Sequence, residues 1–413
     1  MREPLLLPVL ILGCASSVGG TPPRDAAAPD ALLDAAPSLD RTPADDTLSL
    51  DPRCTAMPCL QHPILRSHGT GIWLVFPDGR TFHWGQSQFV GGPPDLAPTP
   101  GPRLPADLLD LQAGPRHSCA LRASGGRVIC WGQNTDGQLG NALPEAAREP
   151  VEVAGIRGVT ALALAETSTW AVRDGALAYW GTPGALGNLP PTASPRPAFD
   201  LSNALAFSGS PVGDSLGVIL RDGTALAWGR NDWGNLGDGT RQTRTAPVAI
   251  RDLRGVLSLH LSANASCAVA AAGPAGNGLC WGERHWLGNL VRQNPPEIFS
   301  TPAPLAGPQD LIQMVVGEYF ACAVDGSLTV RCWGINLEGV LGAGSLELEG
   351  LSPNGPLVRL PAVREIALAG RAVCALTMDD VVYCWGDASR GVLAQGDDID
   401  RPSPVRAYPA RTR

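Results

Sequence analysis

Several hallmarks of known activities are missing from this 413-residue chain. It has no HExxH zinc motif, no Gly-x-Ser-x-Gly nucleophile elbow, no phosphate-binding loop and no dinucleotide fingerprint. No apolar run is long enough to cross a bilayer as a helix. The net charge is −8 and Lys and Arg are not clustered, so the basic face that nucleic-acid binding requires is absent. We therefore expect no enzyme activity, no cofactor and no nucleic-acid partner.

Metal-binding patterns are also lacking. The six histidines show no metal-ligand spacing, and we interpret His117 as a structural hydrogen-bonding residue rather than a catalytic base. The acidic stretch 397–400 lacks the ordered oxygen ligands of a calcium loop, so we interpret it as a solvated turn. The sequence predicts no metal site and no catalytic residue.

The chain does contain a repeat. Tryptophan is scarce, with 11 residues in 413, yet seven of them are followed directly by Gly, at intervals of 47 to 53 residues. A fixed period of this size is the signature of a repeat architecture. We interpret each of these tryptophans as a wedge buried between neighbouring repeats, with the Gly allowing close backbone approach. They are Trp84, Trp131, Trp180, Trp228, Trp281, Trp333 and Trp385.

Each repeat predicts four short strands. An apolar run such as 159–164 comes first, and a second strand such as 267–269 follows it. A turn containing Asp-Gly or Gly-Gly then leads into a third strand that ends on the Trp. A Pro-led segment such as 247–250 closes the unit, which is typical of an outermost edge strand. The pattern predicts an all-β fold: a seven-bladed β-propeller of four-stranded antiparallel blades.

The residues after the Trp carry a family resemblance. The segments 228–240 (WGRNDWGNLGDGT) and 131–140 (WGQNTDGQLG) resemble the repeat of the regulator of chromosome condensation family. The resemblance covers roughly residues 60–407 and is blurred in the first and third repeats. It implies a seven-bladed propeller that is usually closed by strands from both termini. It does not imply one activity, since the family includes a nucleotide-exchange factor, a plant UV-B photoreceptor and secreted β-lactamase inhibitors.

Ten of the eleven cysteines occur in pairs. Four repeats carry one Cys on the second strand and one directly before the Trp, and the other three repeats carry neither, which predicts disulfides between adjacent hairpin strands. Each would add roughly 2–3 kcal/mol and indicates an oxidising compartment. The alternative, metal binding, is disfavoured because separate blades do not bring four thiols together. The pairs are Cys119 with Cys130, Cys267 with Cys280, Cys322 with Cys332, and Cys374 with Cys384, and a further candidate pair is Cys54 with Cys59.

The N-terminal region predicts export. The apolar stretch 4–12 ends just before Cys14, which resembles a bacterial lipoprotein signal with Cys14 as the lipidated residue. An ordinary secretory signal and a misassigned start codon are the alternatives. Residues 14–52 are rich in Ala, Pro and Asp, and we expect a disordered tether that spans on the order of 35 Å. The predicted organisation is a signal peptide at 1–13, the tether at 14–52 and the propeller at 53–413.

Aromatic residues mark one candidate binding surface. Phe89, Trp233 and Trp286 each stand five residues after a repeat Trp, so repeat symmetry places them on one face. The alternative is that each packs on its own blade. We interpret the protein as a monomeric, non-catalytic binding scaffold, anchored by lipid at the bacterial outer membrane or cell surface or held in the periplasm. Its loops would bind a protein partner; the alternatives are a secreted enzyme inhibitor and a glycan-binding module.

Overall fold

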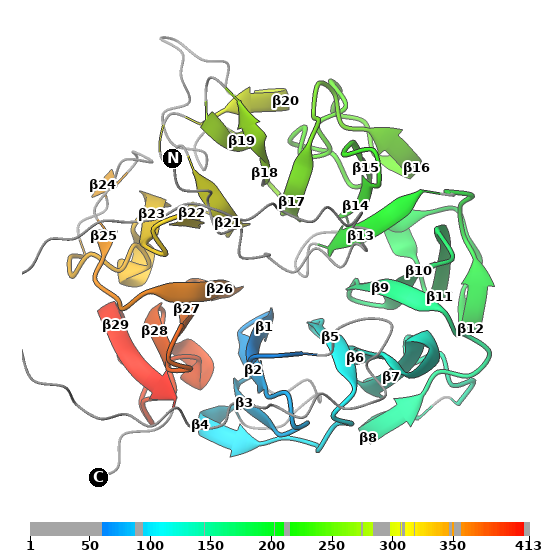
Figure 1. Ribbon diagram of the computed structural model, residues 1–413, viewed down its shortest axis with the longest axis horizontal. Coiled ribbons are helices and arrows are strands. Elements are labelled where there is room, and N and C mark those ends of the chain that lie inside the picture. Colours follow the sequence, from blue (N-terminus) through cyan, green and yellow to red (C-terminus); the bar gives the residue numbers. More distant parts are fainter. Residues whose placement is uncertain are drawn as a thin grey trace, which may run out of the picture.

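The ring of blades is the main feature of the computed structural model (Figure 1). The structure describes residues 60–86, 94–143, 145–201, 203–209, 215–273, 276–283, 298–305, 307, 310–317, 319–346, 349–350 and 357–408. In these residues the chain forms strands β1 to β29 in seven antiparallel sheets, with short 3-10 turns and no α-helix. The predicted all-β fold with seven blades is confirmed.

The strands of the blades follow one another along the chain. Blades 1 to 3 contain, in order, β1 (Ile64–His68), β2 (Gly71–Val75), β3 (Thr81–Gly85) and β4 (Asp95–Pro100); β5 (Leu108–Ala113), β6 (His117–Arg122), β7 (Arg127–Gly132) and β8 (Ala147–Glu152); β9 (Val159–Leu164), β10 (Ser168–Arg173), β11 (Ala176–Gly181) and β12 (Thr192–Pro197). Blades 4 and 5 contain β13 (Ala204–Gly209), β14 (Ser215–Leu220), β15 (Ala225–Gly229) and β16 (Arg244–Ala249); β17 (Val256–Leu261), β18 (Ala265–Gly273), β19 (Gly276–Glu283) and β20 (Ile298–Pro304). Blade 6 contains β21 (Leu311–Val316), β22 (Phe320–Asp325), β23 (Val330–Ile335), β24 (Glu349–Gly350) and β25 (Leu357–Val358), and blade 7 contains β26 (Val363–Ala369), β27 (Ala372–Thr377), β28 (Val382–Gly386) and β29 (Arg401–Tyr408). The 3-10 turns are η2 (Ser124–Gly126), η3 (Gly184–Leu186), η5 (Leu337–Gly339) and η6 (Ser389–Gly391).

Each blade is a meander of neighbouring strands. The first strand lies innermost, and the fourth strand forms the outer edge. The Pro-led segments lie in these outer strands, for example Pro150 in β8 and Pro247 in β16, as predicted, because an edge strand tolerates a residue without an N–H. In blade 6 the outer edge is divided between β24 and β25, which both pair with β23.

The ring closes without strand exchange. All strands of blade 1 come from residues 64–100 and all strands of blade 7 from residues 363–408, so the expectation of closure by strands from both termini is wrong for the described residues. Side chains join the two blades instead. The Trp84 indole donates to the Val392 carbonyl across the seam at 2.9 Å. Tyr408 of blade 7 lies 5.0 Å from the Phe82 ring of blade 1, measured between centroids.

The Trp-Gly dipeptides lock neighbouring blades together. All seven tryptophans are buried, with at most 1% of their surface exposed, which confirms the wedge interpretation. Each following Gly has a positive φ. At Gly132 φ is 115°, and a Cβ atom would lie 2.6 Å from the Arg116 carbonyl oxygen. Only Gly permits this approach of the third strand to the start of the second.

Candidate functional site

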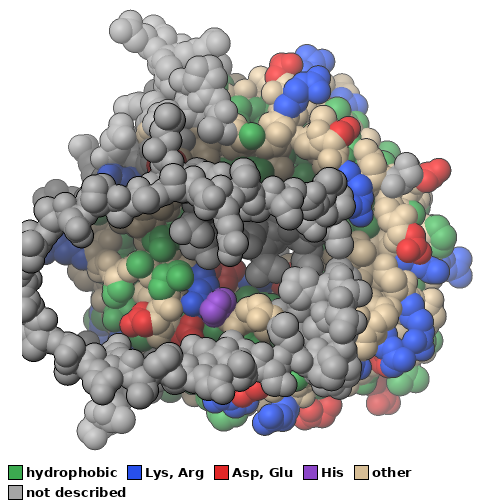
Figure 2. Space-filling model, in the orientation of Figure 1, with side chains coloured by type: hydrophobic (Ala, Val, Ile, Leu, Met, Phe, Trp, Pro, Cys, Tyr) green, Lys and Arg blue, Asp and Glu red, His purple; other side chains and the backbone are tan. Residues whose placement is uncertain are grey.

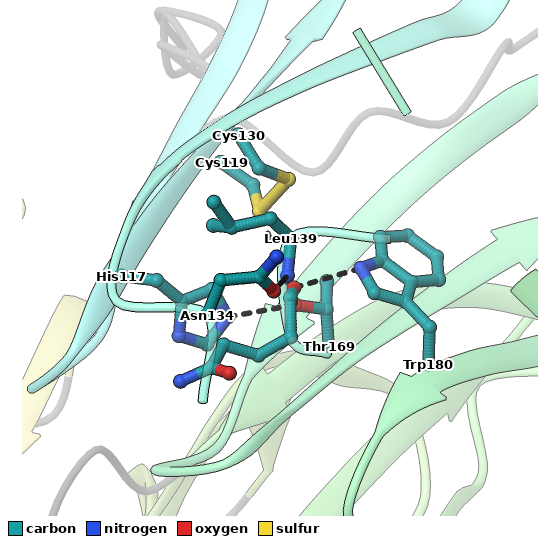
Figure 3. Close-up of a disulfide and its surroundings, with 8 residues drawn as sticks. His117, Cys119, Cys130, Asn134, Leu139, Thr169 and Trp180 are labelled. Carbon is teal, nitrogen blue, oxygen red and sulfur yellow. Dashed lines mark hydrogen bonds between the residues drawn. A yellow bond between two sulfur atoms is a disulfide. The ribbon is translucent and has the colours of Figure 1, made fainter. Parts of the chain in front are cut away.

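A hydrogen bond from the indole connects four of the seven wedges to the blade before them, namely Trp84, Trp180, Trp281 and Trp385. In blade 2, the Gln138 carbonyl accepts hydrogen bonds from the Trp180 indole and the Thr169 hydroxyl of blade 3, both at 2.9 Å (Figure 3). The same arrangement joins blades 4 and 5, where the Asn235 carbonyl accepts from Trp281 and from Ser266, both at 2.8 Å. Where this bond forms, the next blade fixes the loop that follows the wedge.

His117 extends the first of these two arrangements. Its Nε2 lies 2.7 Å from the Thr169 hydroxyl oxygen. Because that hydroxyl donates to Gln138, Nε2 carries the hydrogen and donates to Thr169. Burial lowers the pKa of His117 to about 3, so the imidazole is neutral. These contacts agree with a structural hydrogen-bonding role for His117.

The four cysteine pairs predicted within blades face one another across the second and third strands. Their sulfur atoms lie 2.02 to 2.14 Å apart, which fits the predicted disulfides. Each pair packs in the same buried cluster as the Trp wedge of the following blade. In Figure 3 the Cys119–Cys130 bond lies beside Thr169 of the next blade, with Sγ of Cys119 3.9 Å from the hydroxyl oxygen.

Two of the blades without cysteines have an aromatic pair at the register where the other blades have a cysteine pair. In blade 3, Trp170 stands opposite Tyr179, and in blade 1, Trp73 stands opposite His83, with centroids 5.6 and 5.1 Å apart. Blade 4 has a Gly217–Ala227 pair, and Leu259 of blade 5 fills the space where a Gly217 Cβ would lie. These pairs were not among the residues predicted from the sequence. Alignment of the second strands would have revealed them, because the offset from the Trp is nearly constant.

The remaining predicted residues divide between described and undescribed parts of the chain. Trp233 is described and is 37% exposed. Phe89, Trp286, Cys14, Cys54 and Cys59 lie outside the described residues. The shared aromatic face therefore reduces, in the described residues, to Trp233 in the loop after β15.

The Trp233 loop is held by side-chain hydrogen bonds. Asn231 accepts from the Leu236 N–H at 2.9 Å and donates to the Thr240 carbonyl at 3.1 Å. The Arg241 guanidinium lies 6.0 Å from the centroid of the Trp233 ring and donates to the Asp232 carbonyl at 2.7 Å. The half-exposed indole therefore lies on a loop that side-chain hydrogen bonds hold in place.

A cavity of about 560 Å³ occupies the centre of the ring, and all seven innermost strands contribute to its wall. Figure 2 shows basic, acidic and histidine side chains next to one another at the ring centre. Arg66 of β1 pairs with Asp110 of β5 at 2.8 Å and with Glu365 of β26 at 2.5 Å. The carboxylates raise the pKa of Arg66 above its usual value against the opposing effect of burial, so the guanidinium stays charged. This triad joins blades 7, 1 and 2.

Other polar side chains link the inner strands of blades 5 to 7. Gln313 of β21 both donates to and accepts from the Ile366 backbone, each at 2.9 Å. His260 accepts the Val316 N–H through Nδ1 at 3.3 Å, and burial lowers its pKa to about 4. Within the described residues, no three His, Cys, Asp or Glu side chains form a group suited to a metal ion. The same residues contain no helix of the length and apolar character needed to span a membrane.

Comparisons with known proteins agree on the repeat. The Regulator of chromosome condensation (RCC1) repeat is matched at residues 125–172 and 222–269, and by a related model of that repeat at residues 110–138. The chain is 29% identical over 317 residues to the Ultraviolet-B receptor UVR8 of Arabidopsis thaliana, covering 73% of this chain and 70% of that protein. It is 26% identical over 321 residues to the E3 ubiquitin-protein ligase HERC2 of Homo sapiens, covering 71% of this chain but 6% of the ligase.

Solved structures share the fold. Yeast RCC1 (Prp20), solved with Kap60 bound, aligns with a TM-score of 0.66 at 18% identity, over 79% of this chain and 83% of that chain. Human WBSCR16 aligns with the same TM-score at 19% identity, over 79% of this chain and 93% of that chain. At these identities the likeness concerns the fold alone.

Proposed function

Because the chain is a seven-bladed propeller that carries regulator of chromosome condensation repeats, we propose that it is a non-catalytic scaffold whose loops bind a protein partner. The observation that carries the proposal is the Trp233 loop. A half-exposed Trp beside Arg241, on a loop that Asn231 holds in place, has the composition and rigidity of an interface anchor. Ordering such a loop costs little on binding, because it is already ordered.

Similar proteins support protein binding in general. The yeast Prp20 fold was solved bound to Kap60, and Prp20p was also studied for its binding to Gsp1p and histones. For this chain we propose a different protein partner, located at the bacterial cell envelope. Cys14 would be the lipid anchor that holds the chain there. The cysteine pairs at disulfide distance support an oxidising compartment.

The test is affinity capture with the oxidised full-length protein from the envelope fraction of the native cells. Three baits are compared: the wild type, Trp233→Ala, and Leu143→Ala, a control that removes another exposed apolar side chain. The proposal expects one stoichiometric protein with the wild type and Leu143→Ala, and its loss with Trp233→Ala. Retention of polysaccharide without protein would replace the scaffold with a glycan-binding module, and equal capture by all three baits would remove Trp233 from the interface.

A further inference from the structure

The loop after β15 carries more positive than negative charge, although the whole chain has a net charge of −8. Residues 230–244 contain three Arg and two Asp. Arg230 pairs with Asp232, and Arg244 pairs with Asp238 at 2.7 Å. A neighbouring cation therefore already compensates each carboxylate of this loop.

Arg241 is the remaining cation, and it lies beside the exposed indole of Trp233. Its Nε donates to the Asp232 carbonyl, which holds the guanidinium 6.0 Å from the centroid of the indole ring. Arg241 is exposed, and no residue in the described part of the chain accepts a hydrogen bond from its two terminal nitrogens. A guanidinium with free nitrogens can bind a carboxylate through two parallel hydrogen bonds.

A second arginine approaches the same loop from the end of β16. A Cβ atom on Gly239 would lie 2.9 Å from Cζ of Arg251, so this guanidinium lies against the loop two residues before Arg241. Arg251 is exposed and forms no ion pair with a described residue. The Gly239 N–H donates to the Ser300 carbonyl of β20, a strand without charged residues. The Trp233 loop is thus apolar at its indole and basic beside it.

We propose that the protein partner binds the Trp233 loop through an acidic segment, in which a carboxylate side chain lies close to an aromatic or aliphatic one. The apolar side chain would pack on the exposed part of the Trp233 indole, and the carboxylate would accept hydrogen bonds from Arg241. Trp and Arg are enriched among binding hot spots, and complementary charge contributes to the choice of partner. This inference rests on the proposed function and specifies the chemistry of the partner.

Labelled peptides test this chemistry. The acidic probe is Gly-Glu-Asp-Phe-Glu-Asp-Gly; a neutral probe has Gln and Asn in place of Glu and Asp, a basic probe has Lys there, and a fourth probe has Gly in place of Phe. Fluorescence anisotropy with the oxidised full-length protein at low salt measures their binding. We expect saturable binding of the acidic probe, with the other three at least about tenfold weaker.

The comparison of probes can contradict the inference in three ways. Non-specific attraction to a chain of net charge −8 would favour the basic probe. No binding of the acidic probe, or equal binding of the acidic and neutral probes, would overturn the proposal. Tighter binding of a thymidine oligonucleotide than of the acidic probe would also overturn it, and would assign the loop to single-stranded nucleic acid.

Matched variants test the position of the site. Arg241→Gln should weaken binding of the acidic probe roughly tenfold and leave the neutral probe unchanged, whereas Trp233→Ala should weaken both probes. The control is Arg173→Gln, which removes an exposed arginine at the β10–β11 hairpin of blade 3 and should change neither. An equal effect of Arg173→Gln on the acidic probe would assign the binding to overall charge and overturn the proposal.

Affinity capture with Arg241→Gln as a further bait separates this inference from the proposed function. Capture that is lost with Trp233→Ala but retained with Arg241→Gln would leave the scaffold in place and overturn the acidic segment. Loss of the same captured protein with both variants, together with binding of the acidic probe, would support the inference. Absence of any captured protein would overturn the proposed function, and the probes alone would then decide whether the loop binds acidic segments.

Discussion

Trp170 stands opposite Tyr179 at the register that four other blades give to two cysteines, and the two rings lie 5.6 Å apart. Both kinds of pair occupy the same place in the ring, next to the Trp wedge of the following blade. Trp170 packs edge-on against Trp228, with centroids 5.6 Å apart, as Cys119 and Cys130 pack beside Trp180. The position therefore joins two strands of one blade and supports the wedge of the next, by a covalent bond or by a pair of rings.

Loss of one disulfide should destabilise the ring without unfolding it. We expect the double variant Cys119→Ala/Cys130→Ala to lower the free energy of unfolding by about 2–3 kcal/mol, because a short loop is no longer closed in the unfolded chain. Denaturant unfolding followed by Trp fluorescence measures this. Thiol titration of the unreduced, denatured wild type is the companion measurement: detection of thiols from the eight paired cysteines would contradict the disulfide assignment.

The Gly after each wedge should be intolerant of a side chain. Gly132→Ala introduces a Cβ 2.6 Å from the Arg116 carbonyl oxygen at a φ of 115°. The control is Gly155→Ala, which has a φ of 76° but meets no atom within 4 Å. We expect Gly155→Ala to cost about 1 kcal/mol from backbone strain and Gly132→Ala to cost clearly more. Equal midpoints of thermal unfolding for the two variants would show that the close approach is unimportant.

Much of the fold was accessible from the sequence, because its signals are local. The Trp-Gly dipeptide recurs once per blade, and the Asp-Gly turns and leading prolines act within one blade, so they predicted the number of blades and the edge strands. Ring closure was not accessible in this way. It depends on contacts such as Glu365 with Arg66, which lie far apart in sequence and meet only once the ring has formed.

The candidate sites divide in the same way, between features local to one blade and features that need the whole ring. The cysteine pairs were predictable because both members belong to one hairpin. The opposed Trp73 and His83 belong to one hairpin as well, but an aromatic pair does not identify its partner as two cysteines do. The central cavity could not be predicted, since its wall comes from the innermost strands of all seven blades, whose neighbours are set by the order of the ring.

The proposed lipid anchor at Cys14 leads to a prediction about location. Wild-type protein expressed in its native cells should sediment with membranes, and mass spectrometry should detect an acylated N-terminal Cys14. Cys14→Ala should move the protein to the soluble fraction, since lipid chains supply the membrane affinity. The control is Cys54→Ala, which should leave sedimentation unchanged. Membrane association of Cys14→Ala equal to that of the wild type would refute the anchor.

His117 and His260 should make the ring less stable as the pH falls. Folding lowers the pKa from 6.5 to about 3 for His117 and to about 4 for His260, because burial disfavours the charged imidazole. The unfolded chain therefore binds more protons below pH 6.5. The contribution of the two groups is complete above that pH and is lost as the pH falls toward their folded pKa values.

Each histidine should contribute a slope of about 1.4 kcal/mol per pH unit where the unfolded chain is protonated and the folded protein is not. Between pH 6 and 5, we expect His117→Gln to flatten the dependence of the free energy of unfolding on pH by nearly one such slope. Urea unfolding at several pH values measures it. Asp107 and Asp238 also have lowered pKa values, but they start from 3.8, so their effects fall mainly at lower pH. An unchanged slope in His117→Gln would mean that His117 does not remain neutral in the folded ring.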